Sequence, residues 1–98
     1  MITELALLRL LPGSAPAFER AFASVAPLLA EADGCLRHRL VPTLDRPDVY
    51  LLEVVWRDLA AHTQGFEPSD AHARFMAPLE PMLSDDPIVV HVPAGERS

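Results

Sequence analysis

Two alternating segments in the middle of the chain constrain its fold more than any other feature. Residues 35–41, "CLRHRLV", and residues 49–56, "VYLLEVVW", change character from one position to the next, which is the two-residue period of a β-strand. Between them, "PTLDRPD" supplies the proline and aspartate residues that favour turns. The pattern therefore predicts an antiparallel hairpin over residues 35–56.

The segments before the hairpin predict a strand and then a helix. Residues 2–10 are almost continuously apolar and are stopped by Pro12 and Gly13, as expected of a short strand covered on both faces. Ser14 can cap the helix that follows, and Gly34 can end it. Apolar residues recur in this helix at three- and four-residue spacing and form one stripe: Phe18, Ala21, Phe22, Val25, Leu28, Leu29 and Ala32.

The segments after the hairpin predict two helices and a last strand. Asp58 can begin a short helix that Gly65 ends, and Ser69, with an aspartate in the first turn, can begin a longer one. Residues 88–92, "IVVHV", are typical of a strand. The apolar side of the longer helix is expected to carry His72, Phe75, Met76, Leu79 and Leu83.

The complete order of elements is βαββαβ. This order is typical of the ferredoxin-like plait, an α+β fold in which both helices cover one face of an antiparallel sheet. A chain of 98 residues with this order predicts one domain over residues 1–93, and residues 94–98 are expected to form a loose C-terminal tail.

The face of the sheet opposite the helices is predicted to be too apolar for water. If Leu36, His38 and Leu40 share the helix-facing side with Tyr50, Leu52, Val54 and Trp56, the other side holds Cys35, Arg37, Arg39 and Val41 beside Val49, Leu51, Glu53 and Val55. Its charges can compensate across strands, with Arg37 or Arg39 against Glu53. We therefore expect a homodimer in which this sheet face packs against its own copy.

Charge and hydropathy exclude several classes of protein. All eight basic residues are arginines, and fourteen acidic residues give a net charge of −6, which disfavours a nucleic-acid partner. The lack of lysine removes Schiff-base chemistry and the phosphate-binding P-loop. No apolar run approaches the roughly 20 residues that cross a membrane, and the start, "MITELALLRLLPG", lacks the features of a signal peptide, so we expect a cytoplasmic protein without a membrane partner.

Taken in order, five segments carry a family resemblance: "LLPGSAPAFERAF", "GCLRHRL", "RPDVYLLEVVWRD", "AHTQGFEPSDAHARF" and "PIVVHV". From residue 2 to about residue 92, the chain resembles the antibiotic biosynthesis monooxygenase domain family. The resemblance implies a plait that dimerises sheet to sheet into a dimeric α/β barrel, with a pocket between the sheet and the helices. It also implies oxidation of phenols or quinols by dioxygen, with no bound cofactor.

The motifs of two family branches match this sequence unequally. The haem-degrading branch uses an Asn on the first strand and an iron-binding His in the last helix, and Ala6 and Met76 stand at those places, which disfavours haem degradation. The quinone-forming branch has a Trp at the end of the third strand, with an Asn on that strand and a Tyr soon after it. Trp56 matches, whereas Leu52 and His62 occupy the other two places.

Trp56 and the residues of the next helix are the main candidates for the site. The Trp56 ring can form a pocket wall while its N–H meets solvent or a substrate oxygen, or it can be a core residue only. One short helix can present both His62 and Phe66 on its inner side. A neutral His62 could accept a phenolic proton. An equally good interpretation is a structural histidine that is hydrogen-bonded to a backbone carbonyl.

The remaining candidates come from other elements. His72 lies on the apolar stripe of the longer helix, where a polar group must be hydrogen-bonded or face a cavity, and Phe75 would share that side. His38 would share the helix-facing side of the sheet with Trp56, either as a pocket residue or as a satisfied core histidine. His91 is assigned a structural role. The histidines lack the spacings of a zinc site, so no metal is expected.

These observations predict a monooxygenase that needs no cofactor and oxidises a small aromatic phenol or quinol with dioxygen. His62 or His72 would be the base, and Trp56 the stacking wall, with Phe66, His38, Leu52 and Phe75 also contacting the substrate. The alternative is a non-catalytic small-ligand-binding or stress-related protein of the same dimeric barrel fold. The monooxygenase requires a proton acceptor beside the substrate hydroxyl, whereas the ligand-binding protein does not.

Overall fold

The computed structural model describes residues 1–95, and its strands and α-helices follow one another in the predicted order. The elements are β1 (Ile2–Arg9), α1 (Ala15–Ala30), β2 (Cys35–Pro42), β3 (Val49–Trp56), the π-helix η1 (Ala61–Phe66), α2 (Asp70–Met76), the 3-10 helix η2 (Glu80–Met82) and β4 (Ile88–Pro93). Residues 96–98, the end of the expected loose tail, lie outside the described residues.

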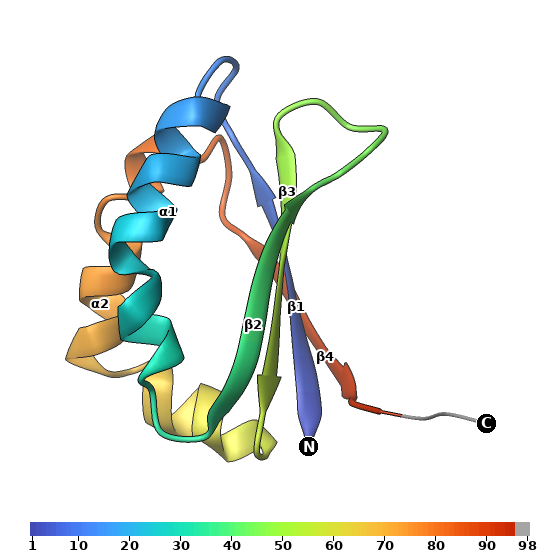
Figure 1. The fold of residues 1–98 in the computed structure, drawn as a ribbon, viewed down its shortest axis with the longest axis vertical. Coiled ribbons are helices and arrows are strands. Elements are labelled where there is room, and N and C mark those ends of the chain that lie inside the picture. The colour runs from blue at the N-terminus through green and yellow to red at the C-terminus, as the bar shows by residue number, and fades with distance from the viewer. Residues whose placement is uncertain (96–98) are drawn as a thin grey trace.

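The four strands form one antiparallel sheet in the order β2-β3-β1-β4. Figure 1 shows α1 and α2 side by side on one face of this sheet, with the opposite face left uncovered. The arrangement confirms the predicted α+β ferredoxin-like plait. None of the helices within residues 1–95 is long and apolar enough to cross a membrane.

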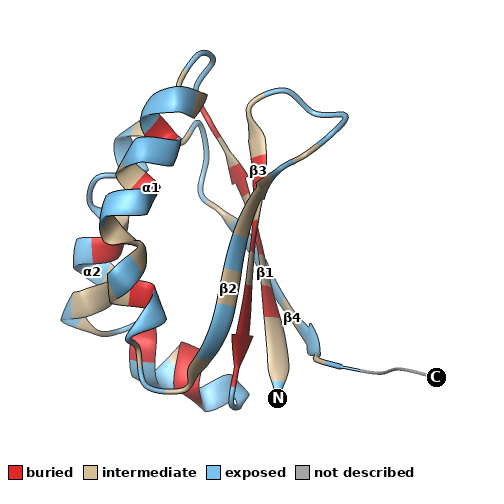
Figure 2. Cartoon of the chain, in the orientation of Figure 1, coloured by how far each residue is buried: buried red, intermediate tan, exposed pale blue. Residues whose placement is uncertain are grey.

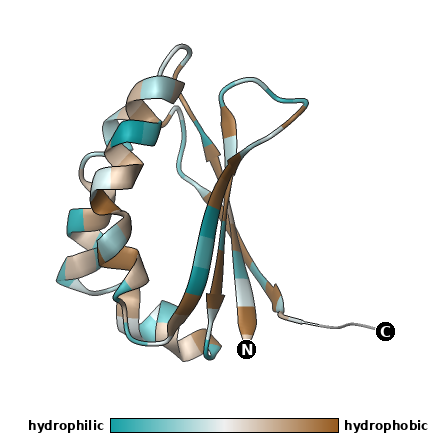
Figure 3. Cartoon of the chain, in the orientation of Figure 1, coloured by the Kyte–Doolittle hydropathy of each residue, from teal (hydrophilic) through white to brown (hydrophobic). Residues whose placement is uncertain are grey.

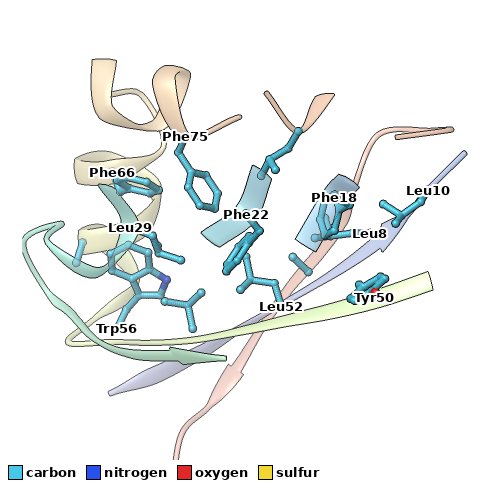
Figure 4. Close-up of a cluster of buried hydrophobic side chains, with 14 residues drawn as sticks. Leu8, Leu10, Phe18, Phe22, Leu29, Tyr50, Leu52, Trp56, Phe66 and Phe75 are labelled. Carbon is cyan, nitrogen blue, oxygen red and sulfur yellow. The ribbon is translucent and has the colours of Figure 1, made fainter. Parts of the chain in front are cut away.

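The core lies between the sheet and the helices. Inward positions of β1 and β3 alternate with outward ones, as the two-residue period requires, and they meet the apolar stripe of α1. Figure 2 shows the buried residues concentrated on these facing surfaces, and Figure 4 shows the aromatic rings among them. Phe18, Val54 and Trp56 are completely buried.

The register of the hairpin differs from simple alternation at its first residues. Cys35 pairs with Trp56 and Arg37 pairs with Val55, so Leu36 is an extra residue in a β-bulge. Leu36 is exposed, and Cys35 packs against the core. The expectation that Leu36 faces the helices and Cys35 faces outward was therefore wrong, because a single inserted residue reverses the sides.

Helix ends were predicted with mixed success. Ser69 caps α2, since its Oγ accepts the backbone N–H of His72 at 3.2 Å. The side chain of Ser14 makes no capping bond, and only its carbonyl oxygen accepts the N–H of Phe18. Gly65 does not end η1, which continues to Phe66. Helix α2 is shorter than predicted, because the prolines that follow it have no N–H to continue the ladder.

The uncovered face of the sheet is mainly apolar, and it carries an ion pair in its β2–β3 half. Arg39, one of the two predicted partners of Glu53, pairs with it across β2 and β3 with 2.7 Å between Nε and Oε1. Figure 3 shows hydrophilic bands in the middle of β2 between hydrophobic ones. On the edge strand β4, Ile88, Val90 and Val92 are 49%, 50% and 38% exposed, so this face carries apolar surface that the single chain does not cover.

Candidate functional site

A cavity of about 470 Å³ lies between the sheet and the helices. Its wall is mainly apolar and comes from β1, β3, α1, η1 and α2, including Ala6, Leu52, Phe22 and Phe75. The polar side chains that line it are Glu4, His62, Glu67, His72 and Glu80. A largely apolar cavity of this size with a few converging polar groups is typical of a small-molecule site.

Five of the seven predicted site residues lie at this wall: Leu52, His62, Phe66, His72 and Phe75. Trp56 lies behind it, since the indole is completely buried and stacks on the His62 ring with 5.2 Å between centroids and 18° between planes. His38 lies outside it, in a separate shallow depression shared with Glu19 and Tyr50. The segment from residue 54 to residue 75 thus supplies part of the wall and the Trp56 ring behind it.

Glu4 is a cavity residue that the sequence analysis missed. Its side chain is almost fully buried, and its Oε1 accepts the indole N–H of Trp56 at 2.9 Å. Burial raises the pKa of this carboxyl group above its usual value of 4.5, and the hydrogen bond from Trp56 acts in the opposite direction. The available signal was the alternation within "ITELALLRL", because Glu4 stands in the same inward row as Ala6 and Leu8.

His62 connects Glu4 to a second histidine. Its Nε2 lies 3.4 Å from Glu4 Oε1, and its Nδ1 is 2.8 Å from Nε2 of His91. Burial lowers the pKa of His62, while the nearby Glu67 carboxylate opposes this shift. Both ring nitrogens of His62 therefore face protein groups, and burial favours its neutral form.

His91 belongs to this polar cluster and not to the cavity wall. It stands directly opposite Glu4 in the pairing of β1 with β4, so strand register brings the two side chains to the same face of the sheet. The side chain is half-buried. The structural role expected for His91 did not anticipate its contact with His62, because the contact joins residues 29 positions apart.

His72 differs from His62 in having its ring available. It sits in the first turn of α2 and lines the cavity, where its ring meets Phe66 edge-on with 5.3 Å between centroids. Its capping contact to Ser69 uses the backbone N–H and leaves the side chain free of that task. Within residues 1–95, no side chain or carbonyl hydrogen-bonds to the His72 ring. A neutral imidazole placed in this way can accept a proton from a ligand.

Comparisons with known proteins show the family and the fold of this chain. A family model described as antibiotic biosynthesis monooxygenase matches residues 1–78. The uncharacterized protein YczJ of Bacillus subtilis is 33% identical over 91 residues, which cover 93% of this chain and 96% of that protein.

Solved structures extend the comparison. A candidate antibiotic biosynthesis monooxygenase from Bordetella bronchiseptica is 26% identical, with a TM-score of 0.92 and 97% of each chain covered. SnoaB, a cofactor-independent oxygenase from Streptomyces nogalater, is 21% identical, with a TM-score of 0.81 over 98% of this chain and 94% of its own. The likeness to SnoaB shows the shared fold.

Proposed function

The chain belongs to the antibiotic biosynthesis monooxygenase family, and on this premise we propose that it oxidises a small aromatic phenol or quinol with dioxygen and without a bound cofactor. The observation that carries the proposal is the His72 ring, without a hydrogen-bond partner within residues 1–95, at the wall of an apolar cavity. SnoaB, a cofactor-independent oxygenase of the same fold, supports the proposal that the reaction needs no cofactor.

His72 would act first, as the base. A neutral imidazole at the wall accepts the phenolic proton, and the electron-rich phenolate can then pass electrons to dioxygen. One oxygen atom of dioxygen becomes a ring carbonyl and the other leaves as water, so the phenol loses its O–H and one C–H hydrogen and gives up four electrons. The apolar rings of Phe66 and Phe75 would hold the aromatic substrate and exclude water.

The charges at the wall favour an uncharged substrate. Glu4, Glu67 and Glu80 line the cavity, and no arginine is among the described lining residues. The chain has no lysine. A carboxylated or phosphorylated aromatic would therefore meet acidic side chains without a compensating cation, whereas a neutral polycyclic phenol would not.

Oxygen uptake by the native protein is the direct test. A panel of neutral hydroxynaphthalenes, anthrones and dihydroxybenzenes is offered in air-saturated buffer, with the same compounds carrying a carboxylate as the comparison. The expected result is dioxygen consumption matched by quinone absorbance with the neutral members. No oxygen uptake above the buffer rate with any of them would overturn the proposed function.

The alternative of a ligand-binding protein has one observation in its favour. Both ring nitrogens of His62 face protein groups, as in a polar cluster whose members satisfy one another. A binder would show saturable quenching of Trp56 fluorescence by the same phenols, because Trp56 stacks directly behind the cavity wall, and it would show no quinone formation.

We propose in addition that two copies pack through the uncovered sheet face, with Arg39 and Glu53 near the seam. Leu5 pairs with Val90 across β1 and β4 on this face, and Ile88 and Val92 extend the apolar strip. A chain this small gains stability by covering such surface. The proposed dimer would complete the barrel that the resemblance implies.

We expect the native protein to sediment at about twice its 10.7 kDa chain mass at micromolar concentration. Val90→Asp should shift it to the monomer, because a carboxylate at the seam would be buried beside apolar groups. Leu44→Asp is the matched control, since Leu44 is fully exposed in the β2–β3 turn and should leave the mass unchanged. A native monomer would contradict the proposal.

A further inference from the structure

We propose that Glu4 is a catalytic acid that protonates the reduced oxygen in the cavity, and that His91 and His62 resupply its proton from outside the cavity. The proposal rests on the proposed oxidation by dioxygen and adds three residues to it. It is carried by one chain of contacts: His91 Nε2 to His62 Nδ1 at 2.8 Å, then His62 Nε2 to Glu4 Oε1 at 3.4 Å.

The two oxygen atoms of Glu4 have different surroundings. Oε1 holds both protein contacts, the indole N–H of Trp56 and the His62 ring. Oε2 has no hydrogen-bond partner within residues 1–95, and the side chain lines the cavity. Oε2 is therefore the oxygen that can present a proton to a ligand. Burial in this apolar site favours the protonated carboxyl group, which is the form a general acid requires.

His62 is positioned to pass a proton on while its own ring stays neutral. Its ring is clamped flat against the Trp56 indole, which keeps one nitrogen toward Glu4 and the other toward His91. Because burial disfavours the imidazolium, a proton that enters at Nδ1 is matched by one that leaves at Nε2. The ring stays neutral and only its tautomer changes.

His91 is the entrance of this chain. It lies on the edge strand β4, it is half-buried, and it is not part of the cavity wall. A proton taken up from water at Nδ1 of His91 allows its Nε2–H to pass to His62. Glu4 and His62 thus line the cavity, whereas His91 lies between them and the solvent.

The protons and electrons balance over the reaction. His72 takes the phenolic proton, dioxygen forms a bond to the ring carbon, and Glu4 gives its proton to the resulting peroxide anion. The ring C–H proton is then lost to water, which forms the carbonyl and expels hydroxide as the O–O bond breaks. The hydroxide takes the phenolic proton from His72 and leaves as water, which restores the neutral base. Glu4 regains a proton from His62 at Oε1, a half-turn of the carboxyl group brings that proton to the cavity side, and the proton taken up at His91 balances the C–H proton released to water.

The first test is Glu4→Gln in the full chain. Glutamine keeps an oxygen to accept the Trp56 N–H but has no proton to transfer, so kcat for a phenol that the native protein oxidises should fall about 10²-fold with KM little changed. Glu31→Gln is the matched control, because Glu31 is exposed at the end of α1 and away from the cavity. A Glu4→Gln variant with native kcat would overturn the proposal and leave the proposed function standing.

The second test uses His91→Ala and does not depend on Glu4→Gln folding. Loss of the half-buried ring should lower kcat, and added imidazole should restore it by occupying the vacated space and carrying protons, whereas a purely structural role would show no such rescue. Unchanged kcat, or a lowered kcat that imidazole leaves unrestored, would overturn the relay. A native protein that oxidises no phenol would instead remove the function on which the relay rests.

Discussion

Replacing His72 by alanine will lower the rate of phenol-dependent oxygen consumption by about 10²-fold or more, because loss of a general base typically costs this much. His72 is the imidazole at the cavity wall whose ring has no hydrogen-bond partner within residues 1–95. The fold should survive the change, since Ser69 caps α2 through the backbone N–H of residue 72, which alanine retains. The measurement is kcat from an oxygen electrode, with circular dichroism to check the fold.

His38→Ala is the matched control for this prediction. His38 is half-buried like His72 but lies in the separate depression beside Glu19, so its removal should leave the rate unchanged. Equal loss in both variants would point to a general effect on the fold. If neither His72→Ala nor His62→Ala slows the reaction, neither imidazole serves as the base. That result would contradict the proposed mechanism and favour the ligand-binding alternative.

The hairpin illustrates how much of the fold could be predicted from sequence. Alternation over residues 35–56 predicted that Arg37 or Arg39 lies against Glu53, of which Arg39 does, and it placed Leu52 and Val54 toward the helices. The bulge at Leu36 could not be predicted, because an inserted residue leaves the local alternation intact and changes only its phase relative to the partner strand. Register depends on both strands, whereas the pattern is read from one.

The candidate site combines contacts between residues close in sequence, which could be predicted, with contacts between distant residues, which could not. His62 and Phe66 are four positions apart, and their shared side follows from helical spacing, so the sequence could bring them to one wall. Glu4 reaches Trp56 across 52 positions and His62 across 58, and the pairing of β1 with β3 brings Glu4 to the end of β3 that carries Trp56 and leads into η1. A charge within a nearly continuous apolar strand was the one local sign that such a partner existed.

The cluster behind the wall makes Trp56 the residue whose loss should cost most in stability. Trp56→Ala would leave a cavity where a completely buried indole packs against His62 and Phe66, and it would remove the donor to Glu4. We expect the free energy of unfolding to fall by about 3–5 kcal/mol, the range for such truncations. A chemical denaturation curve measures this directly, and a loss below about 1 kcal/mol would contradict the packing described for Trp56.

Trp56→Phe removes the indole N–H together with part of the buried indole volume, so it costs packing at every pH, and only the pH-dependent part of its penalty reports the hydrogen bond. That N–H lowers the pKa of Glu4, which burial holds above 4.5, so the variant should raise this pKa further. The bond favours the carboxylate, so the contribution of the lost hydrogen bond to the penalty should be small at pH values below the native pKa of Glu4. As the pH rises through that value, the penalty should increase by up to the roughly 1–3 kcal/mol of an unsatisfied buried acceptor. In a Glu4→Gln background residue 4 cannot ionise, so the same substitution should carry a penalty that does not change with pH, and a penalty with the same pH dependence in both backgrounds would show that Glu4 is not its source.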